Sequence, residues 1–345
     1  MPGSLTSAAN ALNATERRPR AVGPAASFVV PELKIVYITN LKAACSTMKW
    51  MLADLTEQDP QQFHRSIGRR PTRAQTIHDR DAWDGVKTLA EYPDWSKLSA
   101  DKGWFVFTLV RDPRARLWSA WQSKLLVGNL GFLGGVVDEP WYPRVPREAS
   151  EVIEDFHRFV EVFAARRRRM RRVGRDGHFR PQADLVYRRD LAYTNVYSLA
   201  DIPTFERDLA AHLVDVGHNT LPSLRRDNDT PLKLTKDVLS GGIGDMIADI
   251  YREDFEHFGS AWEDGPVVHD AEWEPAAFTD IAFRRAAHQR IRDLSAQAND
   301  LSRDVEQLRA AQSGTGDDST RRSYGQVASA VPRAALRKIG KQREQ

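Results

Sequence analysis

The sequence lacks several features that define large classes of protein. It contains one cysteine, Cys45, among 345 residues, so an internal disulfide and a zinc site built from several thiolates are both excluded. It has no run of about 18 or more apolar residues, and residues 1–27 lack an apolar core of signal-peptide length. The formal net charge of +3 is too small to indicate nucleic-acid binding. These absences predict a reduced, cytoplasmic protein without a transmembrane segment.

Alternating strand-like and helix-like patterns run through residues 28–262. This alternation favours a parallel sheet with helices on its faces, which is the α/β class. The two clearest units are strands at 33–39 and 104–110, followed by helices at 48–55 and 115–124. Further helical patterns lie at 152–172, 204–214 and 236–258.

Both strand–loop–helix units place a basic residue where an apolar strand ends, with hydroxyl residues on or near the next helix. In the first unit these are Lys42, Ser46 and Thr47, and in the second they are Arg111 and Ser119. A cation beside a helix N-terminus favours an anion. Two such loops in one sheet can hold the two ends of a doubly phosphorylated nucleotide.

The first loop resembles a P-loop but departs from the common nucleotide-binding patterns. A nucleoside-triphosphatase P-loop requires Gly-x4-Gly-Lys-Ser/Thr, whereas residues 40–47 contain no glycine and Lys42 precedes Ser46 by four positions. This argues against a nucleotide kinase. A Cys-x5-Arg phosphatase loop is also excluded, because Met51 lies six residues after Cys45. Cys45 at a helix start could be a reactive thiol, but a small buried filler is the simpler interpretation.

Five segments resemble the carbohydrate (Golgi-type) sulfotransferases of sulfotransferase family 2. KAACSTMK at 42–49 resembles their 5′-phosphosulfate loop, and FTLVRDPRARLWSAW at 107–121 is similar to their 3′-phosphate motif. HFRPQ, YTNVYSLAD and YREDFEHFG resemble later family segments and follow in the same order, at 178–182, 193–201 and 251–259. The similarity covers about residues 33–260 and suggests a soluble member of bacterial type.

The resemblance implies a P-loop-like sheet and a donor, 3′-phosphoadenosine 5′-phosphosulfate (PAPS), whose sulfuryl group passes to a hydroxyl of a carbohydrate or glycolipid acceptor. No metal is implied, because protein cations can offset the developing charge. Lys42 is the expected catalytic cation, since it would stabilise charge on the bridging oxygen. The 5′-phosphosulfate is expected at Lys42, Ala43, Ala44, Cys45, Ser46 and Thr47, and the 3′-phosphate at Arg111 and Ser119. Solvated or structural roles, such as an ion pair between Arg111 and Asp112, are the alternatives.

An acceptor hydroxyl needs a general base. His78 lies between the two nucleotide motifs, where several relatives carry the base, and is the leading candidate. His64 is the alternative, and His178 could instead line the acceptor side. Asp79 is either an orienting partner of His78 or a solvated charge.

Residues 166–172 contain six arginines and one methionine. A solvated basic face is the default interpretation, and a docking strip for an acidic or sulfated acceptor is the alternative. No aromatic residues are interleaved as a base-stacking platform would require, so we expect no nucleic-acid partner.

The character of the chain changes beyond residue 262, which is the expected end of a sulfotransferase domain over 28–262. A short coiled-coil helix is expected at 281–312, and it leaves two possibilities open: a homo-oligomer formed through the coil, or a helix packed on its own domain. A non-catalytic adaptor, in which a degenerate nucleotide domain carries this coil, is a further alternative function. Residues 1–27 and the basic tail at 313–345 are expected to be disordered. The seam of the helix is formed by Ile291, Leu294, Ala298, Leu301, Val305 and Leu308.

Overall fold

In the computed structural model, the described residues fall into two units that meet between Ile291 and Arg292. Residues 1–27 and 313–345 were expected to be disordered, and most of them lie outside the described residues. No helix among the described residues is long and apolar enough to cross a membrane. The structure describes residues 26–64, 76–92, 94–132, 135–170, 172–186, 191–225 and 230–313.

The sheet has five strands in the order β3-β1-β2-β4-β5. Strands β2, β4 and β5 are parallel, as expected, whereas β1 pairs antiparallel with both β2 and β3. The sheet is therefore mixed rather than wholly parallel. Only residues 31–34 separate β1 from β2, and a parallel crossover needs about a dozen residues or more. The strands are β1 (Phe28–Val30), β2 (Ile35–Tyr37), β3 (Lys87–Thr88), β4 (Phe105–Val110) and β5 (Asn195–Ser198).

Side chains alternate between the two faces of the sheet, as the two-residue period of a strand requires. On β4, Phe105, Phe107 and Leu109 enter one buried cluster with residues of α2 and α8. Val106 and Val110 enter another, which includes residues of α7 and the end of α10. The helices of these layers are α2 (Cys45–Leu55), α8 (Ile202–Asp215), α7 (Gln182–Val186) and α10 (Arg252–Phe258).

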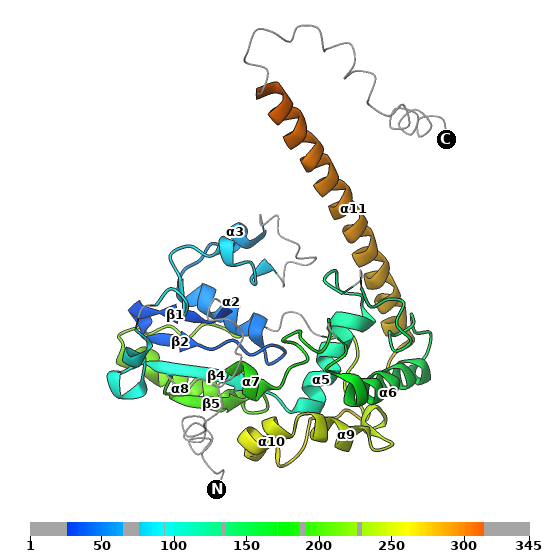
Figure 1. The fold of residues 1–345 in the computed structure, drawn as a ribbon. Coiled ribbons are helices and arrows are strands. Elements are labelled where there is room, and N and C mark those ends of the chain that lie inside the picture. Colours follow the sequence, from blue (N-terminus) through cyan, green and yellow to red (C-terminus); the bar gives the residue numbers. More distant parts are fainter. Residues whose placement is uncertain are drawn as a thin grey trace. The chain divides into compact units, whose positions relative to one another are not determined.

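A third buried cluster lies among helices next to the sheet (Figure 1). Trp118 and Trp121 of α5 both meet the Phe156 ring of α6 edge-on, at 4.9 and 5.3 Å between ring centroids. Phe278 and Ile281, near the start of α11, belong to the same cluster. Its helices are α5 (Pro113–Trp121), α6 (Ala149–Arg166), α9 (Ile243–Ile250) and α11 (Pro275–Ser313).

Helix boundaries differ from the expected ones where glycine or an unusual turn intervenes. The single helix expected at 236–258 is broken twice. Gly241 and Gly242, which both adopt positive φ (62° and 81°), a conformation that glycine favours, separate η7 from α9. Tyr251 separates α9 from α10. After α5 the chain continues as η6, a π-helical turn, and such turns are frequent at functional sites. The remaining short helices are α3 (Pro60–His64), η2 (Pro31–Leu33), η3 (Arg80–Ala82), η4 (Trp95–Lys97), η5 (Ala100–Lys102), η6 (Gln122–Leu126), η7 (Asp237–Leu239) and η8 (Gly259–Trp262).

Candidate functional site

The first loop leaves the sheet after β2 and turns sharply into α2. Lys42 and Ala44 both have positive φ (68° and 55°), and Ala44 is the N-cap of α2. Non-glycine residues in this conformation carry strain of about 1–2 kcal/mol each, and such strain clusters at ligand sites. The turn directs the first N–H groups of α2, which have no partner within the helix, toward the end of the sheet where β2 finishes.

The other residues expected in this loop lie at the start of α2 or just before it. Ala43 is buried, and Cys45, the first residue of the helix, is half-buried rather than fully buried as expected for a filler. Ser46 is buried and Thr47 is half-buried in the first turn. The loop therefore combines one lysine, two hydroxyl side chains and a helix N-terminus, which together suit an anion.

Arg111 follows the last residue of β4, the parallel neighbour of β2, so both loops leave the same edge of the sheet. Its Nη1 donates a hydrogen bond to the carbonyl of Lys42 at 3.4 Å, which joins the two loops. The Asp112 carboxylate instead forms a two-point ion pair with Arg114 (3.0 and 2.6 Å) and caps α5. Ser119 is buried on α5, and no described contact links it to Arg111, so its role stays a prediction.

Gln182, the first residue of α7, forms hydrogen bonds with residues of both loops. Its Oε1 accepts hydrogen bonds from Asn40 Nδ2 and from the backbone N–H of Arg111, both at 2.9 Å. Its Nε2 donates to the carbonyl of Arg111 (2.8 Å) and to Asp254 Oδ2 (3.3 Å). Gln182 and Asp254 are both fully buried. The amide of Gln182 therefore connects the two loops where they leave the sheet.

Arg116 holds the first loop from the side of α5. Although its side chain is 1% exposed, its guanidinium donates to three carbonyls, those of Leu41, Arg180 and Gly177, at 2.8, 2.7 and 3.1 Å. Burial lowers the pKa of Arg116, and nearby Asp254 opposes that shift. The Arg116 guanidinium thus holds the backbone that precedes Lys42 and adds positive charge near the Lys42 side chain.

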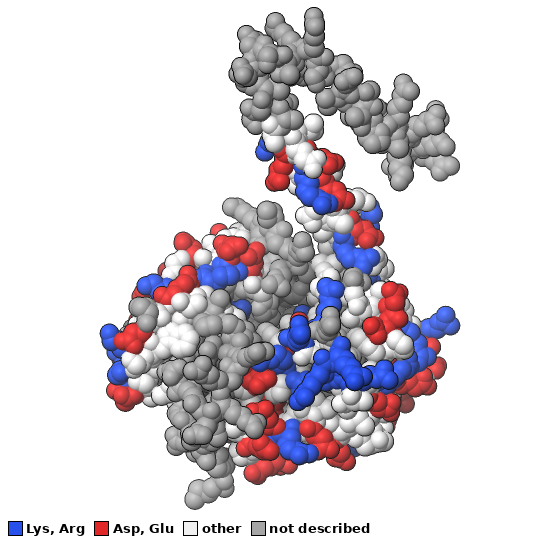
Figure 2. All heavy atoms as spheres, in the orientation of Figure 1, with Lys and Arg blue, Asp and Glu red and all other residues white. Residues whose placement is uncertain are grey.

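Lys42 lies within this group of cations. Burial lowers the pKa of Lys42 to about 7, and the positive charges of Lys124, Arg111 and Arg116 contribute to that shift. Lys124 comes from the π-helical turn that follows α5. Figure 2 shows Lys and Arg side chains gathered in a band over α5 and α6. The site therefore has an excess of positive charge that an anionic ligand would neutralise.

Two histidines approach the first loop. His78 Nε2 lies 2.9 Å from Ser46 Oγ, within hydrogen-bond distance. Asp79 caps η3 through the N–H of Asp81, at 3.3 Å. His178 Nδ1 donates to Asp176 Oδ1 at 2.6 Å. Burial, with Lys124 and Lys42 nearby, lowers the pKa of His178 to about 3, so its ring is neutral near pH 7.

His64, the other candidate base, lies at the end of α3. Its ring approaches that of Trp50, with 6.5 Å between the ring centroids, and no described contact joins it to the first loop. In the basic run, Arg166, Arg168, Arg169 and Arg172 are exposed, which fits both a solvated face and a docking strip.

Sequence reasoning assigned no role to Gln182, Asp254, Arg116 or Lys124. The first three lie inside segments already singled out by their resemblance to the family, so that pattern could have flagged them. Nothing local marks Lys124. Among the described residues, no group of three His, Cys, Asp or Glu side chains is arranged to hold a metal ion.

Comparison with known proteins adds one finding. Residues 26–260 match the model of a protein family described as the Sulfotransferase family. No curated protein and no solved structure shows a significant match to the chain.

Proposed function

The chain belongs to the sulfotransferase family, and on this premise we propose that it transfers the sulfuryl group of PAPS to a hydroxyl of a carbohydrate or glycoconjugate acceptor. The observation that carries the proposal is the junction of the two loops. Arg111 Nη1 bonds the carbonyl of Lys42, and Gln182 holds the strand ends of both loops. One nucleotide with two anionic ends would span such a pair.

The charge of the site supports a doubly phosphorylated donor. Lys124, Arg111 and Arg116 are close enough to help depress the pKa of Lys42 to about 7. Asp112 is already engaged by Arg114. A bound anion would restore Lys42 to its cationic form, because an opposite charge nearby favours the charged state.

Each loop has a distinct task in this proposal. Lys42, with the first N–H groups of α2 and the hydroxyls of Ser46 and Thr47, holds the phosphosulfate end, while Arg111 and Ser119 hold the 3′-phosphate. The donor supplies an activated sulfuryl group. The ammonium of Lys42 stabilises the negative charge that grows beside it during transfer, a contribution typically of about 3–4 kcal/mol.

His78 is the proposed general base. Its Nε2 lies 2.9 Å from Ser46 Oγ, in the first turn of the helix that follows the first loop. An imidazole is suited to accept the proton of an alcohol near neutral pH. His178 is the less suitable base, because burial and the nearby lysines lower its pKa and so weaken its affinity for that proton.

The test is transfer of label from sulfur-labelled PAPS to glycan and glycolipid fractions, without magnesium. Lys42→Ala and Arg111→Ala should each reduce transfer by roughly 10²–10³-fold. The matched controls Lys97→Ala and Arg207→Ala remove exposed cations and should leave transfer unchanged. If Lys42→Ala and Arg111→Ala transfer as much label as the wild type, the assignment of the site is wrong. Label only in non-carbohydrate fractions would refute the acceptor class.

Calorimetry with adenosine 3′,5′-bisphosphate separates binding from turnover. We expect binding that Arg111→Ala weakens. Binding without transfer to any acceptor would favour the non-catalytic adaptor, and no binding by folded protein would refute the donor site itself.

A further inference from the structure

We propose that residues 291–311 of two copies of this chain pair as a parallel, two-stranded coiled coil, which makes the protein a homodimer. The proposal rests on the sequence and exposure of α11 and is independent of the nucleotide site. The partner that covers the apolar stripe of α11 is a second copy of this chain.

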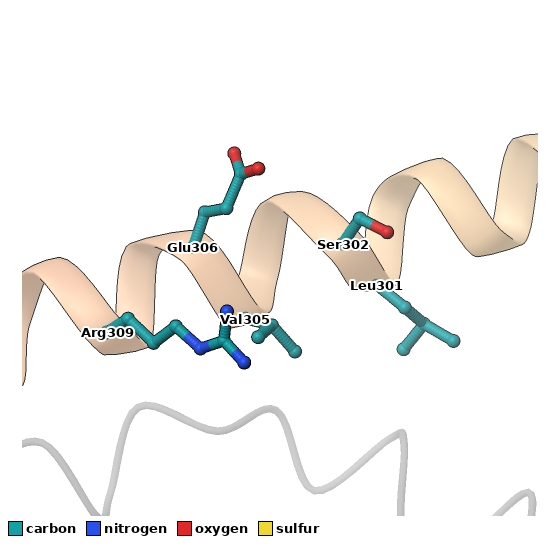
Figure 3. A pocket seen from close by; sticks show the side chains of 5 residues that line it. All are labelled: Leu301, Ser302, Val305, Glu306 and Arg309. Atoms are coloured by element: carbon teal, nitrogen blue, oxygen red, sulfur yellow. The ribbon is translucent and has the colours of Figure 1, made fainter.

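The apolar stripe of α11 is exposed over most of its length. Leu294, Leu301, Val305 and Leu308 are 46%, 65%, 45% and 60% exposed. Figure 3 shows Leu301 and Val305 projecting from one side of the helix together with Arg309, and Glu306 from the opposite side. These residues and Ser302 line a pocket on α11. A continuous stripe of large apolar side chains marks an interaction surface rather than scattered surface residues.

The heptad pattern of the stripe specifies the number of strands. With Ile291 at position a, the a positions hold Ile291, Ala298 and Val305, and every d position holds leucine. Two of the three a residues, Ile291 and Val305, are β-branched. In parallel coils, β-branched residues at a with leucine at d favour two strands over three or four. The seam begins at Ile291, the last residue of the folded unit. Positions b and c are polar throughout: Arg292, Asp293, Asn299, Asp300, Glu306 and Gln307.

Charge complementarity specifies the direction of the second helix. Asp304 occupies position g and Arg309 the following position e. In a parallel dimer, g of one helix faces the following e of the other, so Asp304 meets Arg309 of the second copy, twice by symmetry. In an antiparallel pair g faces g and e faces e, which would leave these opposite charges apart.

The oligomeric state of the full chain tests the proposal. Sedimentation at increasing concentration should reach twice the chain mass of 39.0 kDa. Leu301→Asp with Leu308→Asp should return the protein to 39.0 kDa, because it places carboxylates in the seam. The matched control, Asn299→Asp with Gln307→Asp, adds the same charge on the outer face and should stay dimeric. Both variants should keep the thermal transition of the folded unit.

A charge-exchange experiment tests the direction. Asp304→Arg alone and Arg309→Asp alone each place like charges across the seam and should weaken self-association. An equimolar mixture of the two should form heterodimers, because both g–e pairs of the mixed dimer then join opposite charges. A chain that stays at 39.0 kDa, a larger assembly, a dimer that survives the two seam substitutions, or a mixture without preferred heterodimers would each overturn the proposal.

Discussion

The amide of Gln182 should be the most sensitive structural position of the site. Two neighbouring groups keep a hydrogen bond in Gln182→Ala. Asn40 Nδ2 still donates to the carbonyl of Leu109, and Asp254 Oδ1 still accepts from the N–H of Ala183. The N–H and carbonyl of Arg111 lose their Gln182 partners. Each of these two part-buried hydrogen bonds contributes about 0.5–1.5 kcal/mol, and the lost side chain leaves a cavity. We therefore expect a loss of about 3–5 kcal/mol in unfolding free energy.

Gln182→Glu separates the bonds that Gln182 accepts from those that it donates. The glutamate oxygens can still accept from Asn40 and from the N–H of Arg111, but an ionised carboxylate cannot donate to the Arg111 carbonyl or to Asp254. Burial beside Asp254 raises the pKa of the new carboxyl above its unfolded value. Its destabilising effect is therefore smallest below the unfolded pKa and grows as pH rises toward the folded pKa.

Urea unfolding followed by tryptophan fluorescence measures the loss, and calorimetry with adenosine 3′,5′-bisphosphate measures the site. Gln307→Ala, on the exposed outer face of α11, is the control and should change stability by less than about 0.5 kcal/mol. If Gln182→Ala unfolds within about 1 kcal/mol of the wild type, the network does not support the fold as argued. If folded Gln182→Ala binds the bisphosphate normally, Gln182 does not position the two loops.

Three further outcomes are expected. Because the pKa of Lys42 is about 7 in the free protein and an anion raises it, bisphosphate affinity should fall as pH rises above 7 and binding should take up a proton. Calorimetry in two buffers of different ionisation enthalpy measures this uptake, and Lys42→Arg, which stays charged, should abolish it. His78→Ala should keep bisphosphate affinity while turnover falls roughly 10²–10⁴-fold. The control His269→Ala, which removes an exposed histidine, should leave turnover unchanged. Unchanged turnover in His78→Ala would exclude His78 as the base. Arg116→Lys cannot reproduce the planar three-carbonyl contact and should lose about 2–4 kcal/mol in urea unfolding; a neutral result would refute its structural role.

The two strand–loop–helix units were predictable from sequence because their signals are local. An apolar run ending at a basic residue marks β4 and Arg111. The helix expected from residue 115 begins two residues earlier, at Pro113, because Asp112 is its N-cap and proline is favoured at the first helical position. The family match over residues 26–260 confirms the sulfotransferase family that the motifs indicated, and the carbohydrate acceptor stays a prediction.

The contacts between remote segments that assemble the site could not be predicted from local sequence signals. Gln182 and Asn40 lie 142 positions apart, and Ser46 and His78 lie 32 apart. Their residue types permit many partners, so composition and spacing do not select one. The pairing of Asp112 with Arg114, rather than with Arg111, likewise depends on the path of the helix.

The sequence by itself determined the two strand–loop–helix units of this protein, the cation at the end of each of their strands and the heptad seam of its last helix, because these follow from residue type and short-range period. Only the tertiary structure decided that β1 and β3 run antiparallel, that one buried amide connects the two loops, and that Lys42 stands among cations that depress its pKa. These properties depend on burial and on distances between remote segments, which exist only once the chain has folded.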